Sequence, residues 1–344
     1  MSEPLYVPVL PTRPHATAAY RGLWPDAQNA VMPVWSLPPR PGLSRTDLAT
    51  AIRKDLALVV QAQRYQQAWL DAPFAVESEA GVLAELLREA SSRGPLRPVT
   101  GPGRPAGQQA AALSIARLSG YGLGIRVTVP GEWGSGTTDD VRDLLARADL
   151  SVQVDLLLDL VTVRADRPDA GKEALRALDA LVPLAPWRTV ALLSGGFPEV
   201  TADALERGEF EEPRMDWSMW RDIAASGRSY LPVLRYGDYG IQPASALARV
   251  PRAAGGGPPW GSLRYTTDQS FVIAKTLARG DGRAAHNRAA ARRILELPDF
   301  RGPGASGGEV WLRNCAHGSG GVGTFGKWLT VGNIQHMAFA VRSL

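Results

Sequence analysis

The stretch Val154–Val163, which reads VDLLLDLVTV, is the clearest strand in this sequence. Side chains alternate between the two faces of a strand, so its even-numbered apolar residues share one face while Asp155 and Asp159 share the other. The outer wall of a parallel barrel packs on helices and is apolar. If the strand belongs to such a barrel, both aspartates point into it.

Similar apolar runs recur along the first 240 residues or so, separated by helix-length segments or loops. Strands that alternate with helical patterns indicate βαβ units and a parallel sheet. Eight such units match a closed (β/α)8 barrel, which takes roughly 250 residues. We therefore predict an α/β fold, a (β/α)8 TIM-like barrel. The other seven runs are Tyr6–Leu10, Val31–Leu37, Ala68–Phe74, Leu96–Thr100, Gly122–Val129, Arg188–Ser194 and Tyr230–Tyr236.

Several segments between the runs have apolar residues at the three- and four-residue spacing of a helix that packs on a sheet. After the glycine- and proline-rich stretch Arg252–Gly261 the rhythm changes. We predict that residues 1–250 form the barrel and that residues 251–344 form an α+β extension packed on it, near the C-terminal ends of the strands. The predicted helices are Thr46–Gln61, Gly81–Glu89, Asp139–Ala148, Gly171–Leu181, Asp216–Ala225 and Ala284–Leu297, and the predicted strands of the extension are Arg264–Ala274, Glu309–Asn314 and Gln335–Val341.

Composition narrows the class of protein. The 344 residues are 45% hydrophobic, enough for a large core, and the single cysteine, Cys315, excludes an internal disulfide framework. We find no secretory signal at the N-terminus and no apolar run near the roughly 20 residues that span a bilayer. These features predict a cytoplasmic protein without a membrane segment.

Charge is a weaker guide. Only four of the 38 basic residues are lysines. The arginine excess suits phosphate recognition, but biased base composition of the coding DNA explains it equally. From Pro258 onward eleven basic residues face five acidic ones, an asymmetry that can mark a polyanion-binding region.

Strand alternation also predicts a polar site. In Ile125–Val129 it turns Arg126 inward, and in Ala68–Phe74 it turns Asp71 inward. Asp71, Arg126 and Asp159 should therefore converge inside the barrel mouth. One interpretation is a salt-bridge network that fills the barrel, because buried charges need partners. The other is a ligand or catalytic pocket, and the sequence does not decide between them.

The eighth run ends in Leu234–Gly240, which contains Arg235, Tyr236, Asp238 and Tyr239. A turn explains this segment, and so does a binding edge with tyrosine faces for stacking. Arg264-Tyr265 repeats the Arg-Tyr pair and is expected to pack near this loop. His336 is a candidate acid–base or binding group, although a lone histidine is more often structural.

Short blocks of the chain resemble those of the Beta protein family of bacteria and phages, in the same order. The most specific are Arg235-Tyr-Gly-Asp-Tyr-Gly and Arg264-Tyr-Thr. Many members carry a Lys/Gly/Glu cluster after the first strand and a Glu near the end of the second, where this chain has Pro11-Thr-Arg-Pro and Ser36. The resemblance implies a link to phage–host conflict and no particular reaction. The other blocks are Tyr6-Val-Pro-Val-Leu, Pro33-Val-Trp-Ser-Leu-Pro-Pro, the Asp155/Asp159 strand, Gly196-Phe-Pro, Phe300-Arg-Gly followed by Ser306, and Trp328 with His336.

These observations lead us to predict a barrel protein of phage–host conflict that recognises an anionic ligand, a nucleotide or nucleic acid, at the C-terminal mouth. One alternative is a metal-assisted phosphoester hydrolase, with Asp71, Asp159 and Asp238 as catalytic carboxylates that suit Mg²⁺ or Mn²⁺. Another is a non-catalytic scaffold that binds a phage or defence protein. Whether the chain is an enzyme stays open, as does its oligomeric state. The ligand-binding candidates are Arg126, Arg235, Tyr236, Tyr239, Arg264, Tyr265 and His336.

Overall fold

The computed structural model describes residues 5–206, 208–250 and 257–344. Its main feature is a closed barrel of eight strands in the order β1-β2-β3-β4-β5-β6-β7-β9. Neighbouring strands run parallel, including β9 with β1 at the closure. The predicted (β/α)8 barrel is therefore confirmed. The strands are β1 Tyr6–Pro11, β2 Val34–Ser36, β3 Ala68–Asp71, β4 Leu96–Thr100, β5 Leu123–Thr128, β6 Val154–Thr162, β7 Thr189–Gly195 and β9 Leu234–Asp238.

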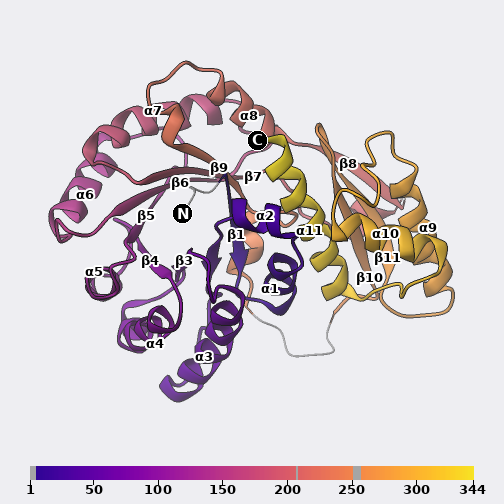
Figure 1. Cartoon of the computed structure of the whole chain (residues 1–344), viewed down its shortest axis with the longest axis horizontal. Helices are drawn as coiled ribbons and strands as arrows, with labels where there is room; N and C mark the ends of the chain where they lie inside the picture. The colour runs from indigo at the N-terminus through magenta and orange to yellow at the C-terminus, as the bar shows by residue number, and fades with distance from the viewer. Residues whose placement is uncertain (1–4, 207, 251–256) are drawn as a thin grey trace.

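Helices form the outer ring of the barrel (Figure 1). The five helices predicted between the strands are present, with ends shifted by a few residues. None of the described helices is both long enough and apolar enough to cross a membrane. The helices of the ring are α1 Pro14–Arg21, α2 Pro25–Ala30, α3 Arg45–Ala62, α4 Ala80–Arg93, α5 Ala106–Ser119, α6 Ser135–Ala146, α7 Ala170–Leu181, α8 Met215–Ala224 and α11 Phe325–Ser343.

The chain closes the ring with its last helix. α11 contacts α1 and β1, on the outer side of the barrel next to the closure between β9 and β1. It takes the place of the helix that would follow the eighth barrel strand, although 86 residues separate the end of β9 from its start at Phe325. The C-terminus is thus part of the barrel wall.

A side lobe, formed by β8, β10, β11, α9 and α10, lies beside the barrel (Figure 1). Its three strands form an antiparallel sheet in the order β10-β11-β8. β8 comes from residues before the predicted boundary at 250, so the lobe is built from both sides of it. Residues 251–256, which include part of the predicted Arg252–Gly261 loop, lie outside the described residues. The bounds are β8 Glu209–Pro213, β10 Trp260–Thr266, β11 Ser270–Leu277, α9 Arg283–Leu295 and α10 Gly307–His317.

Three predictions for this region are wrong in type or extent. The predicted strand Arg264–Ala274 is a hairpin, because the chain reverses between Thr266 and Ser270. The predicted strands Glu309–Asn314 and Gln335–Val341 lie within α10 and α11. Every residue of α11 from 328 to 340 is buried. A helix buried on all sides has no exposed polar face to reveal its period, so a short window of it resembles a buried strand.

The side lobe packs on the loops that follow β7 and β9 and leaves the barrel mouth uncovered by its described residues. One apolar cluster joins Phe197 and Ile241 of these loops to Phe271 and Ile273 of β11. No described residue beyond 256 lines the cavity at the mouth. The expectation that the extension lies near the strand C-termini is met at β7 and β9 only.

Candidate functional site

The barrel interior is closed at its N-terminal end by an ion-pair network. Asp155 of β6 accepts hydrogen bonds from Arg188 Nη2 at 2.6 Å, Arg97 Nη1 at 3.0 Å and Trp69 Nε1 at 2.9 Å. Above it, Leu157 and Leu193 pack with Trp69. The inward direction predicted for Asp155 is therefore confirmed, and Arg97 and Arg188 compensate its charge.

A cavity of about 630 Å³ opens at the C-terminal end of the barrel. We call it the mouth cavity. The residues around it follow or end β3, β4, β5, β6 and β9, which is where (β/α)8 barrels carry their functional sites. Its polar lining residues are Arg104, Arg126, Thr128, Thr137, Asp140, Asp159, Thr162, Tyr239 and Ser245.

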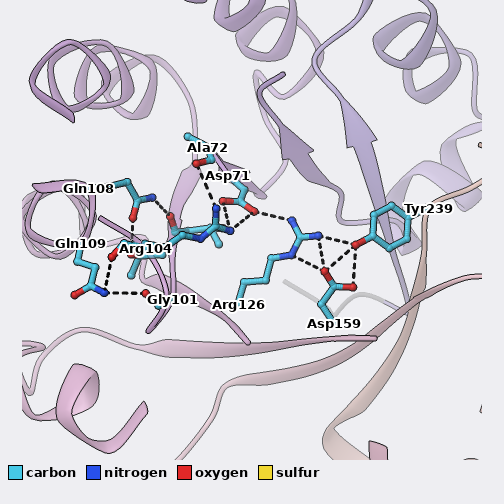
Figure 2. Close-up of polar contacts among 11 residues, drawn as sticks. Asp71, Ala72, Gly101, Arg104, Gln108, Gln109, Arg126, Asp159 and Tyr239 are labelled. Atoms are coloured by element: carbon cyan, nitrogen blue, oxygen red, sulfur yellow. Dashed lines mark hydrogen bonds and ion pairs between the residues drawn. The ribbon is translucent and has the colours of Figure 1, made fainter. Parts of the chain in front are cut away.

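Arg126 is the centre of a polar network at the floor of this cavity (Figure 2). Its Nε and Nη2 donate to one oxygen of Asp159 at 3.0 and 2.7 Å. Its Nη1 donates to Asp71 at 2.6 Å, and Nη2 also donates to the Tyr239 hydroxyl at 2.7 Å. Tyr239 in turn donates to Asp159 at 2.7 Å. The predicted convergence of Asp71, Arg126 and Asp159 is confirmed.

Arg104 completes the group, which we call the mouth network: Asp71, Arg104, Arg126, Asp159 and Tyr239. It precedes α5, and its Nη2 lies 3.1 Å from both oxygens of Asp71. The Gln109 side-chain amide fixes the Arg104 loop by donating to the carbonyls of Gly101 and Arg104 at 3.0 and 3.1 Å. A Cβ at Gly101 would lie 2.2 Å from the carbonyl oxygen of Arg126, so only glycine lets this loop approach β5 so closely.

The mouth network is balanced in charge, with two arginines facing two aspartates. Burial opposes the charge of Arg126, but Tyr239, Asp159 and Asp71 outweigh it and raise the pKa of the guanidinium. Burial raises the pKa of the Tyr239 phenol, and Asp159 adds to this while Arg126 opposes it. Arg126 therefore stays cationic and Tyr239 stays a neutral hydrogen-bond donor near neutral pH.

Val161 carries backbone strain at the rim of the cavity. Its φ is 61°, the left-handed region that a β-branched residue rarely adopts, and β6 shifts register between Asp159 and Thr162. The strained peptide directs the Val161 N–H to Asp159 Oδ1 at 2.8 Å. Such strain clusters at functional sites because it holds a group in a set position. Here it fixes the second oxygen of Asp159.

Asp238 does not join the mouth network. Along β9 the inward position is Gly237, whose neighbours are the interior residues Val7 and Leu193, so Asp238 faces the outer side of the barrel. There it accepts hydrogen bonds from His336 Nε2 and the Tyr236 hydroxyl, both at 2.8 Å, and from the Tyr6 hydroxyl. The prediction that Asp238 shares one site with Asp71 and Asp159 is wrong.

This outer network, Tyr6, Tyr236, Asp238, Thr266 and His336, joins barrel and side lobe. Thr266 of β10 lies 2.8 Å from the other ring nitrogen of His336. All five residues are buried. The predicted ligand candidates Tyr236 of β9 and His336 of α11 thus lie in this buried contact and do not line the cavity.

The carboxylate set predicted for Mg²⁺ or Mn²⁺ is not assembled. Asp71 and Asp159 are engaged by Arg126, and Asp238 lies on the other side of the β9 backbone. Among the residues that the structure describes, no group of three His, Cys, Asp or Glu side chains could hold a metal ion. Arginine bound to both mouth carboxylates does not fit a cation site.

The other ligand candidates lie outside the mouth cavity. Arg235 is near the start of β9, at the opposite end of the strand from Tyr239, and donates to the carbonyl of Pro232 at 2.7 Å. Arg264 reaches the loop after β9, where it donates to the carbonyl of Ile241, as the predicted packing of this segment requires. Tyr265 points into the side lobe, where its hydroxyl accepts from the Arg301 N–H at 3.1 Å.

Arg104 is the residue of the mouth network that sequence reasoning misses. It lies in a stretch rich in Gly, Pro and Arg, where neither strand alternation nor helical periodicity assigns a direction to a side chain. The sequence signal that could identify Arg104 is its position, four residues after the C-terminal end of the predicted fourth strand.

The model of a family described as Beta protein matches residues 6–342. A search of curated proteins finds no match. Among solved structures, the chain is similar to a mandelate racemase/muconate lactonizing protein from Herpetosiphon aurantiacus, with 10% identity and a TM-score of 0.38 over 80% of this chain and 64% of that one. The chain thus spans less than two thirds of that protein. Because the family match extends over nearly its whole length, the chain belongs to the Beta protein family.

Proposed function

We propose that the mouth cavity binds a small anionic ligand of nucleotide size. One observation carries this proposal: two guanidinium groups, Arg104 and Arg126, lie at a cavity of about 630 Å³ at the C-terminal end of the barrel. Small-molecule sites commonly occupy 300–1,000 Å³ and contain a few convergent polar groups. Planar arginine forks bind phosphate and carboxylate groups in two-point contacts.

Donors remain available although the network is balanced. Arg104 Nε donates to no described residue, and its guanidinium is engaged by Asp71 and by the Ala72 carbonyl only. Across the cavity lie Thr137, in the first turn of α6, and the hydroxyl of Thr128. The first turn of α6 contains no acidic residue, so its positive dipole end is open to an anion, while Asp140 of the second turn also lines the cavity. An anionic group between Arg104 and α6 meets donors on both sides.

The same lining favours a nucleotide over a nucleic acid. Asp140 and Asp159 also line the cavity, and carboxylates repel a continuous phosphate backbone. A nucleotide needs only one cationic end of the cavity. Its sugar hydroxyls can donate to Asp140, which is exposed.

Membership of the Beta protein family supports a biological setting for this proposal. We infer that the chain acts in the cytoplasm, in conflict between phage and host, and that ligand binding at the mouth cavity is part of that role. Efficiency of phage plating on cells that carry the wild-type chain or Arg104→Gln is the corresponding readout. Equal protection by both chains would contradict the inference.

A thermal-shift panel tests the binding proposal. The ligands are nucleoside 5′-monophosphates, the matching uncharged nucleosides, inorganic phosphate and a single-stranded oligonucleotide without terminal phosphates. A ligand at 100 times its Kd stabilises the folded state by about 2.7 kcal/mol. We expect at least one monophosphate to raise the Tm and its nucleoside to leave the Tm unchanged.

Arg104→Gln should abolish this stabilisation, because it removes a positive charge at the cavity. Arg93→Gln is the matched control: it removes the same charge at the C-terminal end of α4, where the side chain is 65% exposed and forms an ion pair with Glu89. If no charged compound raises the Tm, or if both variants respond alike, the proposed function is wrong.

A further inference from the structure

A second group of arginines lies beside the mouth cavity, on the side of β1 and β9. Arg13 follows β1, Arg40 follows β2, and Arg249 follows the short 3₁₀ helix η5, Ala244–Ala248. Arg264 reaches the same loops from β10. We call this group, with its two carboxylates, the rim cluster. Its members are Arg13, Arg40, Asp55, Glu199, Arg249 and Arg264.

The rim cluster is continuous with the mouth cavity. Ser245 lines the cavity and donates to Glu199, whose other carboxylate oxygen binds Arg249. Arg13 Nη2 donates to the carbonyl of Arg249 at 3.4 Å. A ligand in the cavity that extends past Ser245 therefore meets Arg249 and Arg13.

The rim cluster has more positive than negative charge. Asp55 pairs with Arg40 at 2.5 Å, and Glu199 pairs with Arg249. Arg13 and Arg264 have no carboxylate partner among the described residues; their hydrogen bonds go to the carbonyls of Arg249 and Ile241 and to the Ser262 hydroxyl. Two guanidinium charges are thus uncompensated, unlike the balanced mouth network.

Burial, together with this excess of positive charge, lowers the pKa of basic groups in and next to the rim cluster. Burial lowers the pKa of Arg264 to about 10, and Arg249 lowers it further while Glu199 opposes. Burial lowers the pKa of His15 to about 4, with Arg13 and Arg264 contributing. The rim cluster keeps its charges close together at a cost in free energy that an anion would reduce.

We propose that the rim cluster binds a second anionic group of the ligand held in the mouth cavity, so that the ligand carries two separated anionic groups; this inference rests on the proposed function. Arg104 follows β4 and Arg249 follows β9, and these two strands stand opposite each other in the ring of eight, so the mouth network and the rim cluster lie on opposite sides of the mouth. Two directly linked phosphates do not span the mouth network and the rim cluster. A nucleoside bisphosphate, with phosphates at opposite ends of the sugar, is the ligand class that does.

Three ligands matched in base distinguish this class: a nucleoside 5′-monophosphate, the 5′-diphosphate and the 3′,5′-bisphosphate, each titrated into the full chain. The bisphosphate should bind at least about 10-fold more tightly than the other two. Arg13→Gln should reduce its affinity about 10-fold and leave the monophosphate affinity unchanged. Arg13 is chosen because its removal leaves no carboxylate unpaired. Arg249→Gln serves as the second variant, and Arg93→Gln as the control.

The outcomes separate the two proposals. If the monophosphate binds in an Arg104-dependent manner, but the bisphosphate has no advantage or keeps it in both rim variants, the rim proposal is wrong and the proposed function stands. If no ligand binds and Arg104→Gln changes nothing, both are wrong. Bisphosphate preference that is lost in Arg13→Gln and Arg249→Gln, but kept in Arg93→Gln, supports both.

Discussion

At the scale of single residues, Arg126 shows how a salt-bridge network can also form a binding site. Arg126 is 8% exposed and Asp159 is 2% exposed, so both charged groups are almost fully shielded from water. The low exposure requires partners for both charges, which Asp71, Asp159 and Tyr239 supply. The same groups form the floor of an open cavity. The two interpretations that the sequence left open describe one structure.

We predict that Asp159→Asn lowers the free energy of unfolding by about 2–3 kcal/mol. Breaking a buried ion pair costs roughly 3–5 kcal/mol, and here Arg126 keeps Asp71 as a partner. The denaturant midpoint measures the loss. Asp139→Asn, which breaks an exposed pair with Arg142, should cost less than about 1 kcal/mol. Equal, small effects of the two variants would show that Asp159 is solvated rather than buried.

Val161→Gly is predicted to leave stability within about 1 kcal/mol of wild type. Glycine relieves a left-handed strain of about 1–2 kcal/mol, which offsets the lost side-chain contacts. The control is Val163→Gly, where a buried valine has ordinary backbone angles and glycine should cost about 2–4 kcal/mol. Chemical denaturation compares the two. A loss at Val161 as large as that at Val163 contradicts the strain argument.

His15 makes stability depend on pH. Because the folded-state pKa is about 4 and the ordinary value is 6.5, the unfolded chain takes up this proton first as the pH falls. His15 therefore costs no stability above pH 6.5, and the free energy of unfolding falls as the pH drops from 6.5 to 4. We predict that the Tm of His15→Gln falls less than that of wild type between pH 7 and pH 5. Parallel pH profiles would refute this.

At the scale of elements, alternation along strands predicts side-chain direction well where a strand is long. In β5 and β6 the apolar face is continuous, so the inward direction of Arg126, Asp155 and Asp159 follows from the sequence. In β9, by contrast, the outward-facing residues Tyr236 and Asp238 are polar. The outer network, which includes residues of α11 and β10, satisfies their hydrogen-bonding groups. A contact between residues 98 positions apart leaves no local pattern to read.

The placement of α11 could not be predicted for a related reason. Its segment is buried on every side because α11 lies between the barrel and the side lobe and contacts both. Periodicity identifies a helix that has one face in water. β8 was missed because its exposed, acidic sequence EFEEP lacks the apolar character of a barrel strand.

Asp238→Asn is predicted to cost about 1–3 kcal/mol of unfolding free energy, because the new amide NH₂ meets donors where the carboxylate accepts from Tyr6, Tyr236 and His336. Ligand affinity at the mouth cavity should not change, since Asp238 does not line it. Denaturant titration and a binding titration on the same protein separate the two effects. A stable variant with lost binding would mean that Asp238 belongs to the site.

At the scale of the whole molecule, barrel and side lobe share elements in both directions. β8 leaves the barrel order between β7 and β9 to join the side-lobe sheet, and α11 returns from the side lobe to the barrel wall. This interlocked path keeps the loops after β7 and β9 beneath the side lobe. The C-terminal ends of β3 to β6, together with residues that follow β9, form the mouth cavity.

The central claim is that the mouth cavity binds an anionic ligand through Arg104 and Arg126. The most direct test is calorimetric titration of the stabilising nucleoside 5′-monophosphate into wild type, Arg104→Gln and Arg93→Gln, each shown to be folded by its denaturant midpoint. We predict that the Kd rises at least about 10-fold in Arg104→Gln, a loss of about 1.4 kcal/mol, and stays the same in Arg93→Gln. An equal Kd in all three proteins would contradict the claim.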